Sequence, residues 1–131
     1  MKALHILYTT CILAALMSCS ESLEERAYRE SKEFTKKNCP APITRELALD
    51  SITFTIPSHT FTSYYSISPK ADFKELDKDR TSEMLLTELK QNTSYRKYKE
   101  MGFNFRYVYY FCGKSNEHLL DVTFKQNDYA R

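Results

Sequence analysis

The sequence of 131 residues is nearly neutral, with 19 Lys and Arg against 17 Asp and Glu and a net charge of +2 at pH 7. This balance gives no electrostatic basis for binding nucleic acid or an anionic membrane surface. With two Gly and four Pro, the composition also excludes a disordered or loop-rich chain, and the length suits one domain with a single core.

The N-terminal segment has the pattern of an export signal. Lys2 gives a short positive start, the mostly apolar run 4–17 follows, and the small residue Ser18 precedes Cys19. Such a run is too short for a stable spanning helix and is typical of a removable signal. The tetrapeptide Leu16-Met17-Ser18-Cys19 resembles the lipobox of bacterial lipoprotein precursors, in which Leu stands three residues before the Cys and a small residue stands directly before it.

This resemblance implies that residues 1–18 are removed and that Cys19 carries the lipid. Residues 19–131 would then form a single domain tethered to a bilayer, because two or more acyl chains anchor a protein stably whereas one binds only marginally. Ser20, rather than Asp, follows the Cys, which by the enterobacterial sorting rule implies the outer membrane rather than the inner one. The chain as a whole resembles the small lipoproteins of Bacteroidota. The alternative is an ordinary signal anchor or cleaved secretory peptide with an incidental Cys.

The mature chain is expected to begin with a helix over 22–37. Ser22 and Glu25 fit a capping box at its start, in which each side chain binds the backbone N–H of the other residue. Two further helical segments are expected: 82–91, capped by Asp79 or Thr81, and 95–101, ended by Gly102.

Alternation of apolar and polar residues predicts four strands in two hairpins. The hairpins are 51–56 with 60–68, and 103–111 with 118–125. Ser63 interrupts the alternation, so a β-bulge is expected near Tyr64 and Tyr65. The expected fold is α+β, a two-layer sandwich with a four-stranded antiparallel sheet and two helices on one face, in the order α-β-β-α-β-β. Whether the hairpins pair through their inner or outer strands stays open.

Cys39 and Cys112 are the two cysteines left for the mature domain after Cys19. In an oxidising compartment a disulfide between them would stabilise the fold by roughly 4 kcal/mol in the chain-entropy model. Two separate buried thiols are the alternative, since the sequence does not give the Cα separation that a disulfide needs.

Tyrosine is the unusual residue, with 10 Tyr against no Trp. Tyr64, Arg106 and Tyr110 are the candidate binding face on the strands, because exposed Tyr offers a large contact area at low entropic cost. The alternative is that these tyrosines reflect β-propensity and packing at the rim of the core.

No catalytic or metal-binding motif stands out in the sequence. His59 and His118 are the histidines that remain after residue 18, and neither lies in a zinc or nucleophile motif. We therefore expect no cofactor and no metal, and a non-catalytic binding or accessory role at the membrane, with an envelope protein or a glycan as partner and no nucleic acid. The alternatives are an immunity or inhibitor protein of the envelope, and an enzyme of unrecognised type that uses His59 or His118.

Overall fold

The computed structural model describes residues 20–70 and 76–131. The lipobox 16–19 and the removable segment 1–18 therefore lie outside the described residues, and the lipid attachment at Cys19 stays a prediction. Within the described part of the chain, no helix is long and apolar enough to cross a bilayer.

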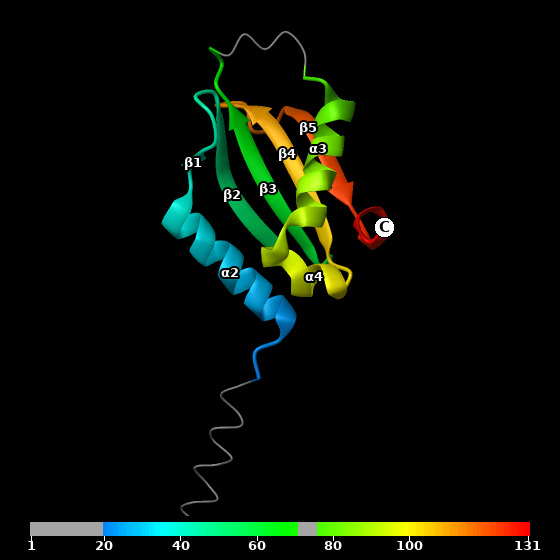
Figure 1. Ribbon diagram of the computed structural model, residues 1–131. Coiled ribbons are helices and arrows are strands. Elements are labelled where there is room, and N and C mark those ends of the chain that lie inside the picture. Colours follow the sequence, from blue (N-terminus) through cyan, green and yellow to red (C-terminus); the bar gives the residue numbers. More distant parts are fainter. Residues whose placement is uncertain (1–19, 71–75) are drawn as a thin grey trace, which may run out of the picture.

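Five strands form one open sheet whose strand order follows the sequence (Figure 1). They are β1 (Ala41–Pro42), β2 (Leu47–Thr55), β3 (Thr60–Ile67), β4 (Asn104–Phe111) and β5 (His118–Phe124). Neighbouring strands are antiparallel except β3 and β4, which are parallel. The predicted α+β class is confirmed, but the predicted four-stranded antiparallel sheet is wrong, because the sheet is mixed and has a fifth strand.

The parallel pair follows from the chain that joins the two hairpins. Between β3 and β4 the chain forms α3 (Lys78–Gln91), the 3₁₀ helix η1 (Thr93–Tyr95) and α4 (Arg96–Glu100). A helical crossover of this kind carries the chain back along the sheet, so the next strand runs in the same direction as β3. The hairpins therefore join through their inner strands.

Helix α2 (Leu23–Asn38) begins where its sequence predicts. The Ser22 hydroxyl accepts a hydrogen bond from the Glu25 N–H at 3.1 Å, and the Glu25 carboxylate accepts one from the Ser22 N–H at 3.3 Å. This capping box satisfies two of the N–H groups that the first turn of a helix leaves without partners.

Helix α3 begins earlier than its sequence pattern predicts. Asp77, rather than Asp79 or Thr81, is the N-cap and accepts a hydrogen bond from the Arg80 N–H at 3.0 Å. The chain ends in the short helix α5 (Gln126–Tyr129).

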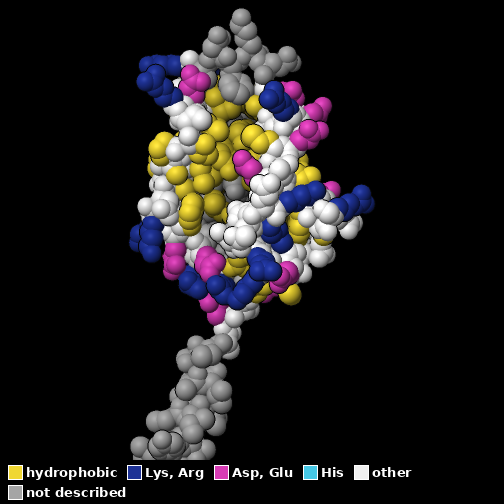
Figure 2. All heavy atoms as spheres, viewed as in Figure 1, with side chains coloured by type: hydrophobic (Ala, Val, Ile, Leu, Met, Phe, Trp, Pro, Cys, Tyr) yellow, Lys and Arg dark blue, Asp and Glu magenta, His cyan; other side chains and the backbone are white. Residues whose placement is uncertain are grey.

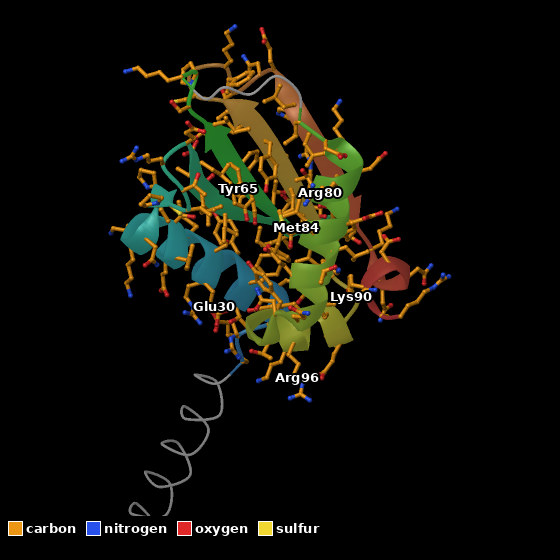
Figure 3. All side chains as sticks on the ribbon, turned by 45° about the horizontal axis from the view of Figure 1, so that its top comes forward. Glu30, Tyr65, Arg80, Met84, Lys90 and Arg96 are labelled. Atoms are coloured by element: carbon orange, nitrogen blue, oxygen red, sulfur yellow. The ribbon has the colours of Figure 1, made fainter. Side chains whose placement is uncertain are left out.

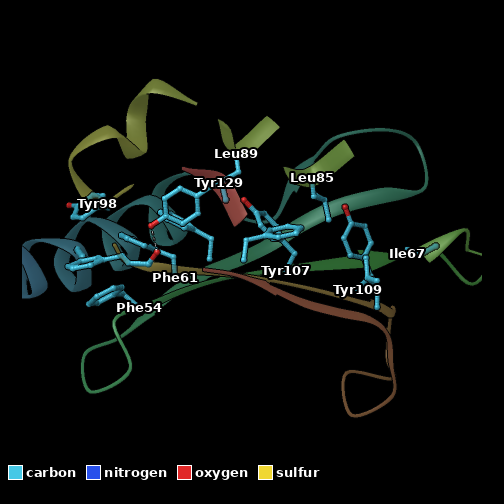
Figure 4. Packing of buried hydrophobic residues seen from close by; sticks show 14 residues of the cluster. Phe54, Phe61, Ile67, Leu85, Leu89, Tyr98, Tyr107, Tyr109 and Tyr129 are labelled. Carbon is cyan, nitrogen blue, oxygen red and sulfur yellow. Dashed lines mark hydrogen bonds between the residues drawn. The ribbon is translucent and has the colours of Figure 1, made fainter. Parts of the chain in front are cut away.

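The helices lie on one face of the sheet, and the core lies between the two layers (Figure 4). Inward side chains alternate along β3 and β4, as expected for strands with one buried face. Figure 4 shows Tyr107 and Tyr109 projecting from β4 toward Leu85 and Leu89, which are both 2% exposed. The two leucines lie on α3, so this helix covers the β4 side of the sheet.

The bulge expected near Tyr64 and Tyr65 lies on the opposite strand. The register between β2 and β3 shifts between Leu49, which faces Tyr65, and Ser51, which faces Tyr64, so Asp50 is the extra residue. Strand β3 itself stays regular. Ser63 therefore keeps its place on the core face, where it is 8% exposed.

Candidate binding groove

A groove opens on the helical face of the sheet, between α2 on one side and α3 with η1 and α4 on the other. Its volume is about 420 Å³. Its lining includes Phe34, Ile52, Phe61, Tyr65, Tyr95 and Tyr107. Figure 2 shows hydrophobic side chains gathered in this hollow. Part of the lining, including Phe61 and Tyr107, belongs to the buried core cluster, so the groove opens directly onto the core.

The groove exists because α2 on one side is separated from α3, η1 and α4 on the other. Helix α2 is fixed along β2 by Thr35, whose hydroxyl accepts a hydrogen bond from the Ile52 N–H and donates one to the Ile52 C=O, both at 2.9 Å. Helix α3 packs over the opposite side of the sheet through Leu85 and Leu89. The central strand β3 is left between them as the floor of the groove. Thr35 also satisfies backbone groups at an edge of β2, which protects that edge from pairing with other chains.

The apolar surface of the groove is only partly covered. Phe34 on α2 is 40% exposed, whereas Ile52 and Tyr65 are half-buried. Figure 3 shows Tyr65 on the sheet between α2, which carries Glu30, and α3, which carries Met84. A partner that covers these side chains would remove apolar area from water at roughly 25 cal/mol per Å².

Ser63 is a polar residue on the sheet side of the groove. Its neighbours on the same face are Phe61 and Tyr65 along β3, Ile52 on β2 and Tyr107 on β4. A small side chain surrounded by four large ones leaves a hollow in the sheet face. Within residues 20–70 and 76–131, the hydroxyls of Ser63 and Tyr107 have no hydrogen-bond partner.

The tyrosines of the groove are neutral at physiological pH. Burial raises the pKa of Tyr95 to about 12, and the nearby Tyr65 hydroxyl adds to this. Burial also raises the pKa of Tyr107, with smaller contributions from Tyr95, Tyr65 and Glu88. All three tyrosines line the groove, and their neutral phenol groups can donate and accept hydrogen bonds there.

Negative charge comes from a carboxylate on each bank. Glu30 on α2 accepts hydrogen bonds from the Tyr98 hydroxyl at 2.8 Å and from Arg26 Nε at 2.7 Å. Burial opposes the charge of Glu30, but these bonds together hold its pKa below the usual value. Glu88 on α3 lines the groove and is exposed. It has no hydrogen bond or salt bridge to any described residue.

The candidate binding face predicted from Tyr64, Arg106 and Tyr110 lies on the opposite side of the sheet. The structure brings the three side chains onto one face, each half-buried. The Tyr110 hydroxyl donates a hydrogen bond to the bulge residue Asp50, which also accepts one from Ser66 at 2.8 Å. Burial, the hydrogen bond and the charge of Asp50 together raise the pKa of Tyr110. These side chains are engaged with one another, and the site role predicted for them stays a prediction.

Arg106 is likewise paired within this open face. It donates to Asp121 through Nε at 2.8 Å and Nη2 at 2.5 Å, and His118 Nδ1 lies 3.2 Å from the same carboxylate. The hydrogen bond from Arg106 holds the pKa of Asp121 below its usual value. Val108 lies beneath this polar layer, completely buried and outside the main core cluster. On this open face of the sheet, hydrogen-bonded polar side chains therefore shield Val108 from solvent.

The two histidines lie far apart and outside the groove. His59, in the turn between β2 and β3, stacks on Phe103 with a ring separation of 5.1 Å and lies 3.6 Å from Glu24. His118 begins β5 on the open face. Neither residue is among those that line the groove. Among the residues that the structure describes, no three His, Cys, Asp or Glu side chains are grouped so as to hold a metal ion.

The fold does not bring the two cysteines together. Cys39 follows α2 beside β1, Cys112 follows β4, and both thiols are free. Strands β2 and β3 separate β1 from β4, which at about 4.8 Å per strand spacing puts roughly 14 Å between them. A disulfide needs Cα atoms within about 7 Å, so this arrangement corresponds to the alternative of two separate thiols, of which Cys112 is exposed rather than buried.

The sequence pattern places Tyr65, Tyr107 and Leu89 on inward faces but does not reveal that a groove separates the helices above them. Ser63 carries the signal that sequence reasoning misses. A polar residue at an inward position of an otherwise apolar strand face indicates either a bulge or a hollow. The structure shows the hollow.

The match to known families covers most of the domain. Residues 22–120 match the family described as Domain of unknown function (DUF8479). The chain belongs to this family. No curated protein sequence matches the chain.

Two solved structures share the fold. A protein from Pseudomonas aeruginosa, classed as secreted, is 17% identical with a TM-score of 0.61, covering 83% of this chain and 98% of that one. The type II secretion system pilotin AspS from Vibrio cholerae is 12% identical with a TM-score of 0.60, covering 81% of this chain and 91% of that one. At these identities the likeness establishes the common fold alone.

Proposed function

We propose that this protein is a lipid-anchored accessory protein of the cell envelope that binds an apolar segment of another envelope protein. The half-open groove between α2 and α3 carries this proposal, because it exposes apolar side chains that a packed core would cover. The role is non-catalytic. Within 20–70 and 76–131, neither His59 nor His118 lines the groove, and the tyrosines that line it are neutral.

An envelope location has two independent supports. The lipobox at Leu16–Cys19 resembles that of bacterial lipoproteins, and one structural neighbour is classed as secreted while the other is a secretion-system pilotin. The pilotin likeness also supports an accessory role toward a secretion or envelope protein. The outer membrane and the acyl chains on Cys19 are part of this proposal.

Dimensions favour a short segment as the occupant. A cavity of about 420 Å³ accommodates several side chains of a helix or extended peptide rather than a folded domain. Fully burying one Phe, Leu or Ile contributes about 1.5–3 kcal/mol. Two or three such anchors suffice for a specific complex of moderate affinity.

Site-specific photocrosslinking in cells tests the groove. A benzoylphenylalanine in place of Phe34 reports on the groove, while the same group in place of Tyr28 is a matched control, since both side chains lie on α2 and are 40% and 44% exposed. We expect one envelope protein to crosslink at position 34 and not at position 28. Equal yields at the two positions would remove the groove as the binding site.

Metabolic labelling tests the anchor separately. An alkynyl fatty acid should label the wild-type protein and not Cys19→Ala, and the wild type should lack residues 1–18. Recovery of an unlabelled protein from the soluble fraction would contradict the lipid anchor while leaving the groove untouched.

A further inference from the structure

The polar hollow inside the groove has a chemistry that the apolar lining does not explain. Ser63 and Tyr107 are only 8% and 9% exposed. An apolar segment bound in the groove would cover their hydroxyls and give them no hydrogen-bond partner. Buried polar groups left unpaired in a complex cost about 1–3 kcal/mol each. The occupant must therefore bring a polar group to this point.

The carboxylates in the groove indicate that this polar group is positively charged. Glu88 lines the same groove without a salt bridge to any described residue. Glu30 adds a second carboxylate on the opposite bank. Among the residues that the structure describes, no Lys or Arg lines the groove. Glu30 is paired with Arg26 outside the lining, so Glu88 supplies the negative charge that has no partner among the described residues.

Aromatic side chains line the groove together with Ser63. Tyr95 packs 5.2 Å from Phe61 and 5.1 Å from Phe105 between ring centroids, and Tyr65 and Tyr107 stand on the two sides of Ser63. Aromatic faces attract a cation, by about 0.5–2 kcal/mol, more when the site is desolvated. Neutral phenol oxygens accept hydrogen bonds from it as well.

We propose that the hollow formed by Ser63, Tyr65, Tyr95, Tyr107 and Glu88 receives a Lys or Arg side chain of the bound segment. This inference rests on the proposed function, since the cation is carried by the segment that fills the groove. The apolar lining provides affinity, and the hollow selects segments with a basic residue at one position. A basic side chain supplies donors to the hydroxyls and a charge to Glu88, which an apolar or acidic side chain does not.

Matched peptides test the hollow. The probes are a short amphipathic peptide of Leu, Ala and Gln with one central Arg, and the same peptide with citrulline, which is neutral and of nearly identical shape. A third peptide carries Lys in that place. Since the protein contains Tyr and no Trp, tyrosine emission or isothermal titration reports binding to the domain.

We expect the Arg or the Lys peptide to bind the wild type about tenfold more tightly than the citrulline peptide. Glu88→Gln should remove this difference and keep the affinity for the citrulline peptide. Glu83→Gln, an exposed carboxylate of the same helix outside the groove, should leave the difference unchanged. Tyr107→Phe should reduce it with little loss of stability, because only a hydroxyl without a partner is removed.

The outcomes separate the two proposals. If all three peptides bind the wild type equally, the cation hollow is refuted while the apolar groove stands. A preference that survives in Glu88→Gln would also refute the hollow. If none of the peptides binds, the proposed function falls together with this inference.

Discussion

Replacing Thr35 with Val should loosen α2 from the sheet and so test what holds the groove open. The two side chains have nearly the same shape, so the change removes a hydroxyl and little packing. That hydroxyl serves both the N–H and the C=O of Ile52, each at 2.9 Å. A net contribution of about 1 kcal/mol per hydrogen bond gives a loss of about 2 kcal/mol in the free energy of unfolding.

Urea unfolding followed by circular dichroism measures this loss. With a slope of about 2 kcal/mol per M, the midpoint should fall by about 1 M. Thr35→Ser keeps the hydroxyl and should retain most of the stability. Thr87→Val removes a hydroxyl that bonds only within its own helix, to the Glu83 C=O, and should change stability by less than about 0.5 kcal/mol. If Thr35→Val were as stable as the wild type, or Thr35→Ser as unstable as Thr35→Val, the hydroxyl would not hold α2 in place.

Three further outcomes follow from other parts of the fold. Gly102→Ala should lower the melting temperature more than Gly113→Ala does. Both glycines have positive φ, but a Cβ at Gly102 would lie 2.9 Å from Oε1 of Gln126, whereas a Cβ at Gly113 would meet no atom within 4 Å. The Arg106–Asp121 pair should contribute less than about 1 kcal/mol, because a third of each side chain is exposed. The pKa of Asp121 is lowered in the folded state, so the stability that the Arg106–Asp121 pair contributes is present above about pH 4 and is lost as pH falls through the folded pKa. Arg106→Leu should therefore reduce the difference in the free energy of unfolding between pH 7 and pH 2. Buried tyrosines with raised pKa, such as Tyr107, favour the folded state below about pH 10 and lose that contribution at higher pH, which predicts cooperative alkaline unfolding coupled to tyrosinate absorbance.

Local chemistry explains which parts of the fold could be predicted from the sequence. The capping box of Ser22 and Glu25 depends on residues three apart, so the sequence contains everything needed to place the start of α2. Gly102 could also be predicted locally as the residue that ends the helical segment with α4. Its φ of +76° is one that glycine adopts without steric cost. Strand alternation likewise predicts which residues of β3 and β4 face the core.

Non-local geometry explains what could not be predicted. The parallel pairing of β3 with β4 depends on how the helical crossover packs, and no strand pattern encodes it. The groove lies between α2 and α3, and α2 is held to β2 by the hydrogen bonds between Thr35 and Ile52, which are 17 residues apart along the chain. Ser63 interrupts the alternation of apolar and polar residues in the sequence, but this interruption is compatible with either a β-bulge or a hollow in the sheet face. Only the register of β2 against β3 distinguishes them.

Helix α2 links the proposed anchor to the groove. Its cap at Ser22 lies three residues after Cys19, a reach of at most about 10 Å. The Arg29 side chain holds Glu21 through two hydrogen bonds, at 2.8 and 3.0 Å, which ties Glu21 to α2. Along the helix, the groove residues Glu30 to Phe34 lie roughly 12–18 Å from its start at 1.5 Å per residue. In the anchored form the groove therefore stands within about 30 Å of the bilayer, so the segment that it binds must lie close to the membrane.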